Sequence, residues 1–281
     1  MFALFHVGRA RHRASQPQEI VPGVYCMETG KGTTRSNVYF VRSGSSWVLI
    51  DTASANCGRL IQKAAVSLFG ENTRPASILL THSHPDHAGS ALELAHMWGR
   101  PVYVHPDELP LAAGEDLSTV KEYSNPLDRW VILPLLRVMP PRAVESMLSK
   151  TSLKDKDVAR AVDPSVGVPG LPDWECIPTP GHTPGHVAFF RNSDRVLIAG
   201  DAVLTVHHLN SLWGFLLWGF RRTKQGLSGP LWYTTWSWRA AKESVAPLAR
   251  LEPRVLASGH GIPMTGAGTA RELRAFADHF R

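Results

Sequence analysis

Short apolar segments alternate with segments of helical periodicity between residues 38 and 104. From Arg59 to Phe69, apolar side chains recur at the spacing of one helix face, and Gly70 ends the pattern. Apolar runs rich in β-branched and aromatic residues predict strands at 38–41, 47–50, 76–80 and 102–104. With helices expected at 59–69 and 88–98, this alternation predicts a layered α/β architecture.

The alternation stops near residue 107 and resumes near residue 174. The part between carries apolar helical segments at 130–139 and 143–148, and a Trp-rich segment follows later, at 212–238. Further strands are expected at 174–178, 186–190, 196–199 and 255–257, and further helices at 240–251 and 270–280. We expect one domain over 1–281, with a helical insertion at about 107–172 and a Trp-rich insertion at about 205–238.

Composition and charge narrow the class of protein only slightly. The chain has 281 residues, 43% of them hydrophobic, which is enough for a sizeable core and rules out disorder as the main state. The net charge of +6 comes from scattered Lys and Arg, so no nucleic-acid partner is expected. No apolar run approaches the ~20 residues of a membrane span. Three cysteines, an odd number, favour a reducing compartment, and we expect a cytoplasmic protein.

The densest chemical signal is the segment His82-x-His84-x-Asp86-His87, directly after the strand expected at 76–80. Alternate residues of a strand point the same way, so His82 and His84 can converge on one ion. Asp86 and His87 lie beyond Pro85, where the chain turns, and can face a second ion. Imidazole and carboxylate ligands without thiolate suit Zn²⁺, and also Fe or Mn. We therefore predict a metal centre at this strand end.

Three more segments place potential ligands at strand ends. The turn Thr179-Pro-Gly-His182-Thr-Pro-Gly-His186 is stiffened by two prolines and presents histidines. Asp201 and His260 each follow an expected strand and a glycine. A single His or Asp after a strand is more often a structural hydrogen-bonding residue. Together the segments are typical of α/β folds, which collect functional residues at the carboxyl ends of their strands.

These motifs resemble those of the metallo-β-lactamase superfamily, in its glyoxalase II-like dinuclear branch, from Asp51 to His260. The resemblance implies a four-layer αβ/βα sandwich of two mixed β-sheets. It also implies the ligand sets: His82, His84 and His182 for the first ion, Asp86, His87 and His260 for the second, and Asp201 bridging both. Asp51 and His186 would support the ligands from behind, and neither His186 nor His105 would bind metal.

The implied chemistry is hydrolysis by a water that two ions activate. Such a centre lowers the pKa of a bridging water toward ~7, so that hydroxide can attack a carbonyl. The chain has no G-x-S-x-G motif, which makes water rather than a side chain the expected nucleophile. Asp86 is expected to be catalytic, orienting the hydroxide and moving a proton to the leaving group. The expected cofactors are two divalent ions, Zn²⁺ before Fe or Mn.

Differences between this sequence and known branches of the superfamily narrow the class of substrate. Only 21 residues follow His260, so the domain with which glyoxalase II enzymes hold glutathione is not expected. Leu204 stands where many acyl-homoserine lactonases have Tyr, which weakens the case for a lactonase. We expect a small-molecule ester, thioester or lactone with an apolar acyl part. A phosphodiester hydrolase on the same metals, and a non-catalytic binding or sensory protein, remain as alternatives.

The apolar insertions allow three interpretations. Trp213, Phe215 and Trp218 can line a substrate pocket, and this is the favoured one. Alternatively, the insertions can form the interface of a homodimer or plain core. Contact with a membrane surface, to which aromatic residues beside Arg221 and Arg222 are suited, is the least favoured.

Overall fold

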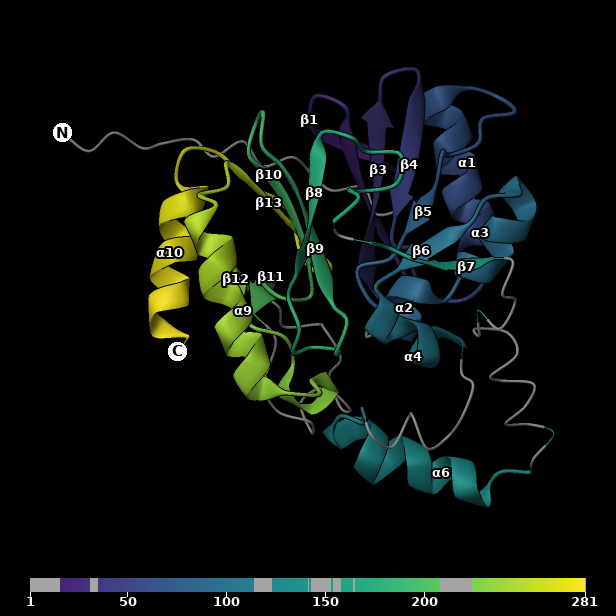
Figure 1. Cartoon of the computed structure of the whole chain (residues 1–281), viewed down its shortest axis with the longest axis vertical. Coiled ribbons are helices and arrows are strands. Elements are labelled where there is room, and N and C mark those ends of the chain that lie inside the picture. The colour runs from purple at the N-terminus through teal and green to yellow at the C-terminus, as the bar shows by residue number, and fades with distance from the viewer. Residues whose placement is uncertain are drawn as a thin grey trace.

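Two β-sheets face each other in the computed structural model, and helices cover their outer sides (Figure 1). The structure describes residues 16–30, 35–113, 123–140, 142, 153, 158–163, 165–207 and 224–280. In these residues no helix combines the length and the apolar character that crossing a membrane requires. The expected helix 143–148 and the predicted pocket residues Trp213, Phe215 and Trp218 lie outside the described residues.

The first sheet has seven strands in the order of the sequence. They are β1 (Gln18–Val21), β2 (Val24–Thr29), β3 (Ser36–Ser43), β4 (Ser46–Ile50), β5 (Ile78–Leu79), β6 (Val102–Val104) and β7 (Ala159–Ala161). β1 to β4 pair antiparallel, and β4 to β7 pair parallel. The helices α1 (Gly58–Phe69) and α3 (Ala91–Trp98) lie on its outer side (Figure 1).

The second sheet has five strands in the order β14-β13-β10-β9-β8. They are β8 (Trp174–Pro178), β9 (Val187–Arg191), β10 (Val196–Gly200), β13 (Val255–Ser258) and β14 (Met264–Thr265). β10 and β13 pair parallel, and the other pairs are antiparallel. The helices α9 (Trp238–Arg250) and α10 (Thr269–His279) cover the outer side of this sheet (Figure 1), and β11 (Leu204–His207) pairs with β12 (Lys224–Ser228) beside it.

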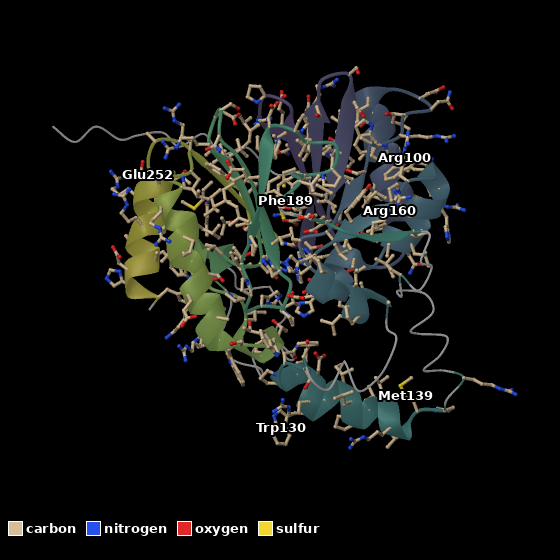
Figure 2. All side chains as sticks on the ribbon, in the orientation of Figure 1. Arg100, Trp130, Met139, Arg160, Phe189 and Glu252 are labelled. Carbon is tan, nitrogen blue, oxygen red and sulfur yellow. The ribbon has the colours of Figure 1, made fainter. Side chains whose placement is uncertain are left out.

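The alternation of side chains along β3 shows how the four layers are held together. Val38 and Phe40 pack with the cluster under α1 and α3, whereas Tyr39 and Val41 pack between the two sheets. Phe189 of β9 meets the latter cluster from the opposite sheet, and Figure 2 shows it in the middle of the molecule. A strand buried on both faces reads as a continuous apolar run. The expected sandwich of two mixed sheets is confirmed.

Two expected elements differ in detail. The helix expected at 88–98 starts at Ala91, as α3, and a separate short helix α2 (Pro85–Ala88) precedes it, with Gly89 and Ser90 between them. A side chain at Gly89 would clash with the Pro85 carbonyl oxygen and the Ala55 nitrogen, so only glycine allows this close approach. The segment 130–139 begins as a π-helical turn (Asp128–Ile132) and continues as α6 (Leu133–Val138).

Candidate metal centre

The segment 82–87 leaves the first sheet after β5 and enters α2, so its side chains point in two directions. His84 is still extended, and Pro85 starts the helix that carries Asp86 and His87. Figure 1 shows α2 at the lower edge of the first sheet. The split between an extended and a helical part lets one short segment supply ligands to two neighbouring positions.

The second sheet supplies the other predicted ligands from three strand ends. His182 lies in the turn between β8 and β9, Asp201 follows β10, and His260 follows β13. Three groups of side chains have ligand atoms within 4.8 Å of one another: His82, His84 and His182; His82, His87 and Asp201; and Asp86, His87 and His260. The structure therefore brings all seven predicted ligand residues together.

Asp201 contacts both halves of this cluster. Its Oδ2 atom lies 3.4 Å from His182 Nε2 and 3.2 Å from His260 Nε2. Its Oδ1 atom lies 3.6 Å from His87 Nε2. His84 Nδ1 and His182 Nε2 are 2.9 Å apart on the other side. One carboxylate thus lies between two sets of imidazoles, in the position expected of a bridging ligand.

Contacts behind the cluster determine which nitrogen of each ring faces inward. Asp51 Oδ2 lies 2.9 Å from His87 Nδ1, and the same carboxylate accepts a hydrogen bond from the Thr81 N–H at 2.8 Å. His260 Nδ1 donates to the Arg35 carbonyl oxygen at 2.6 Å. Both rings are left with Nε2 toward Asp201, which is how outer hydrogen bonds orient metal-binding histidines.

The two other histidines singled out have different partners. His186 Nδ1 lies 2.7 Å from Thr179 Oγ1, and its Nε2 accepts from the Asp201 backbone N–H at 3.0 Å. Both ring nitrogens are engaged, so His186 holds the backbone of Asp201. His105 Nδ1 accepts from the Asp107 N–H at 3.3 Å, at the start of a 3₁₀ turn. Neither belongs to the three groups of possible ligands.

The electrostatics of the cluster divide its histidines into two kinds. Burial and the neighbouring imidazoles hold the pKa of His82 and of His182 well below the ordinary value. Burial also opposes the charge of His87, but nearby carboxylates, led by Asp201, outweigh it and raise the pKa of His87 to about 9. Burial likewise opposes ionisation of Asp201, yet His260 and His87 hold its pKa well below the usual range. A bound cation would displace the proton from a histidine whose pKa is raised, such as His87.

The donor set fits a pair of divalent metal ions. His82 Nε2 and Asp201 Oδ1 are buried and make no hydrogen bond within the described part of the chain. A buried polar atom without a partner is costly, and a cation between these atoms would satisfy both. The ligands are five imidazoles and two carboxylates, and cysteine is in none of the groups. Nitrogen and oxygen donors of this kind suit Zn²⁺, Fe and Mn.

Glu108 is a buried residue at this centre that sequence reasoning missed. Its Oε2 accepts from the Ser83 N–H at 2.8 Å and from the Ser83 hydroxyl at 2.5 Å. Its Oε1 accepts from the Gly185 N–H at 2.9 Å. One carboxylate therefore joins the loop of His82 and His84 to the turn of His182. The sequence after β6 reads like an exposed helix start, and no local pattern signals this role.

Replacing Glu108 by Gln should weaken the first group of ligands without removing any of them. The amide keeps the shape but loses the charge and one acceptor, so it cannot accept all three hydrogen bonds. We expect metal affinity or kcat to fall about tenfold, the lower end of the effect of losing an outer partner. Titration with a metal chelator, beside kcat, measures this. Glu175→Gln, on the exposed face of β8, is the control, and equal behaviour of both variants would contradict the role given to Glu108.

The loop of His260 is tied to the start of β3 in the other half of the chain. Asn37 Nδ2 donates to the carbonyl oxygens of Ser258, at 2.9 Å, and of Gly261, at 2.7 Å. The Tyr39 hydroxyl donates to the Ser258 carbonyl oxygen at 2.6 Å. These bonds hold the loop in place from across the interface between the sheets.

Comparisons with known proteins agree with this geometry. Residues 32–260 match the family model described as metallo-beta-lactamase superfamily. The probable metallo-hydrolase YflN of Bacillus subtilis (strain 168) is 37% identical over 248 residues, 86% of this chain and 87% of that protein. The metallo-beta-lactamase family protein TTHA1429 from Thermus thermophilus aligns with a TM-score of 0.61 at 24% identity, over 93% of this chain and 79% of that one. TTHA1623, solved in a di-iron-bound form, aligns with a TM-score of 0.50 at 25% identity, over 85% and 94%.

Proposed function

The chain belongs to the metallo-beta-lactamase superfamily, and from this premise we propose that it hydrolyses an ester, thioester or lactone with an apolar acyl part at a two-metal centre. The observation that carries the proposal is the position of Asp201. Its carboxylate lies within 3.4 Å of His182 on one side and 3.2 Å of His260 on the other. A carboxylate shared between two ligand groups can hold two ions side by side, as a two-metal hydrolase needs them.

The residues of the chain would divide the work as follows. When bound, two divalent ions supply a water of lowered pKa and polarise the substrate carbonyl. His82, His84 and His182 would hold the first ion, and Asp86, His87 and His260 the second. Asp51 and His186 keep the ligands in position from behind. Each ligand is itself hydrogen-bonded or packed, so little reorganisation is needed when substrate arrives.

Asp86 is the residue that we propose handles the proton. Its side chain is 27% exposed, whereas Asp201 is 7% exposed, so solvent reaches Asp86 more readily than Asp201. Its Oδ2 atom lies 3.4 Å from His260 Nε2. Burial opposes its ionisation, but His87 and His260 hold its pKa below the ordinary value, so the group is a carboxylate at neutral pH. As a carboxylate it would orient the attacking water and relay that water's proton to the leaving group, although its lowered pKa makes it a weak base on its own.

The native metal is part of the proposal. The imidazole-rich donor set favours Zn²⁺, and the di-iron form of TTHA1623 makes iron the first alternative. Elemental analysis of protein purified from cells grown with both metals should give close to two ions per chain, mainly zinc. A firm value of one ion per chain would contradict the dinuclear centre. Two iron ions per chain would contradict only the choice of zinc as the native metal.

A substrate panel tests the reaction class. Acyl thioesters, lactones, a β-lactam and a phosphodiester should be offered to one batch of metal-loaded protein. We expect turnover of carbonyl substrates to exceed that of the phosphodiester by at least about 10²-fold, because the favoured substrates are attacked at carbon. A preference for the phosphodiester would overturn the proposed reaction, as would metal-loaded protein that turns over none of the panel.

A further inference from the structure

A pocket of about 400 Å³ lies between the turn that precedes α6 and the start of α9. The lining of this aromatic pocket has four indole rings, three polar side chains and one proline: Trp130, Trp232, Trp236, Trp238, Ser124, Arg129, Thr235 and Pro126. Its size falls within the range of small-molecule sites. Figure 2 labels Trp130, and Figure 1 places α6 at the lower edge of the molecule.

The rings around the pocket are not part of the hydrophobic core. Trp130 is 76% exposed, and Trp232, Trp236 and Trp238 are 44%, 38% and 37% exposed. Three of them contact a neighbour edge to face, which keeps the ring in place: Trp236 with Tyr123, Trp232 with Tyr233, and Trp238 with Phe280. Folding alone gives no reason to gather exposed indoles around one hollow. An apolar patch of this kind usually marks a binding site.

The aromatic pocket adjoins the first group of metal ligands. Thr235 Oγ1, at its wall, lies 3.4 Å from His182 Nδ1. The Trp236 backbone N–H donates to the His182 carbonyl oxygen at 3.1 Å. On the opposite wall, Asp128 precedes Arg129 in the chain and interacts electrostatically with His84. The pocket therefore lies on the outer side of His182, whose Nε2 faces Asp201, and a substrate held at the metal centre would enter it by extending past this ring.

We propose that the aromatic pocket binds a planar aromatic ring in the acyl part of the substrate. Indole rings hold a flat ring by stacked or edge-to-face contacts, which favour it over a saturated ring of the same size. Among the described lining residues Arg129 carries the one formal charge, so a neutral or anionic ring meets no like charge there. The inference rests on the proposed carbonyl hydrolysis and names the substrate class.

The test compares two acyl groups that differ only in the ring. The substrates are the 3-phenylpropanoyl and 3-cyclohexylpropanoyl thioesters of N-acetylcysteamine. Direct binding of 3-phenylpropan-1-ol and 3-cyclohexylpropan-1-ol, measured by saturation-transfer NMR, gives a readout that needs no turnover. The variants are Trp232→Leu and Trp236→Leu, which remain apolar, and Trp232→Phe, which keeps a ring. Val138→Ala, on the exposed side of α6 and outside the pocket lining, is the control.

We expect the wild-type protein to prefer the phenyl thioester by roughly three- to tenfold in kcat/KM. The preference should disappear in both Leu variants and persist in Trp232→Phe and Val138→Ala, and binding of the phenyl alcohol should follow the same order. Metal content should stay constant throughout.

The outcomes distinguish a failure of the proposed pocket from a failure of the proposed hydrolysis. Hydrolysis with no phenyl preference, or with a preference that the Leu variants retain, would overturn the aromatic pocket and leave the proposed function standing. Ring-dependent binding of the alcohol without hydrolysis of either thioester would support the pocket and contradict the proposed function. Equal binding of both alcohols by the wild-type protein would overturn the pocket.

Discussion

Replacing Asp201 by Ala should remove both metal ions and reduce kcat/KM at least about 10³-fold. The carboxylate lies 3.4 Å from His182 and 3.2 Å from His260, so its loss affects both ligand groups at once. It would also leave the buried imidazole of His87 without the first of the carboxylates that raise its pKa. The effect corresponds to the several kcal/mol that a metal centre contributes to a transition state, each ~1.4 kcal/mol being tenfold in rate.

Elemental analysis and kcat/KM on the same protein preparation measure this effect, and circular dichroism shows whether the variant folds. Asp194→Ala is a matched control, because Asp194 lies in the turn just before β10, away from the cluster, and pairs with Arg191 at 2.7 Å. Loss of this partly buried pair can lower stability but touches none of the predicted ligands. An Asp201→Ala protein that keeps two ions per chain would show that Asp201 does not bridge them.

Gly259→Ala should damage the centre almost as severely, although it removes no ligand. A side chain at this position would clash with Asp201 Oδ1 and would lie 2.7 Å from His87 Cε1. One of the two ligands must therefore move, and displacement by about 1 Å is enough to lose most of the activity. We expect kcat/KM to fall about 10²-fold, with weaker binding of the second ion.

Competition with a chelator should show the weaker binding directly. Gly268→Ala is the matched control, since the nearest atom to a side chain there is the movable carboxylate of Glu272, at 3.2 Å. If Gly259→Ala binds both ions as tightly as the wild-type protein, the close packing of Asp201 against this glycine is not needed for metal binding.

Most helices and strands could be predicted because each depends mainly on residues within its own segment. The hairpin of β3 and β4, helix α1 and strand β8 were each expected from apolar period and turn residues within their own segments. The division between α2 and α3 was not expected, because it depends on the approach of Ala55 to Gly89, a contact between separate parts of the chain.

The same distinction applies to the site. Ligand residues could be recognised because each is a His or Asp in a short segment that follows a strand, and the sheets then bring these segments together. Glu108 could not be recognised, since its partners Ser83 and Gly185 lie in different loops. The aromatic pocket is built from residues around 124–130 and 232–238, and no period within either segment links the two.

The bonds from Asn37 and Tyr39 to the loop of His260 have a consequence for biosynthesis. The ligands do not leave the ribosome together: His82, His84 and His182 are all made before Asp201, and His260 comes last. His260 then has to find the Arg35 carbonyl, 225 residues earlier in the sequence. Joining ends so far apart carries a loop-closure entropy cost, although that cost grows only slowly with length. A nascent chain therefore carries His82, His84 and His182 well before His260, the last of the predicted ligands, has been made.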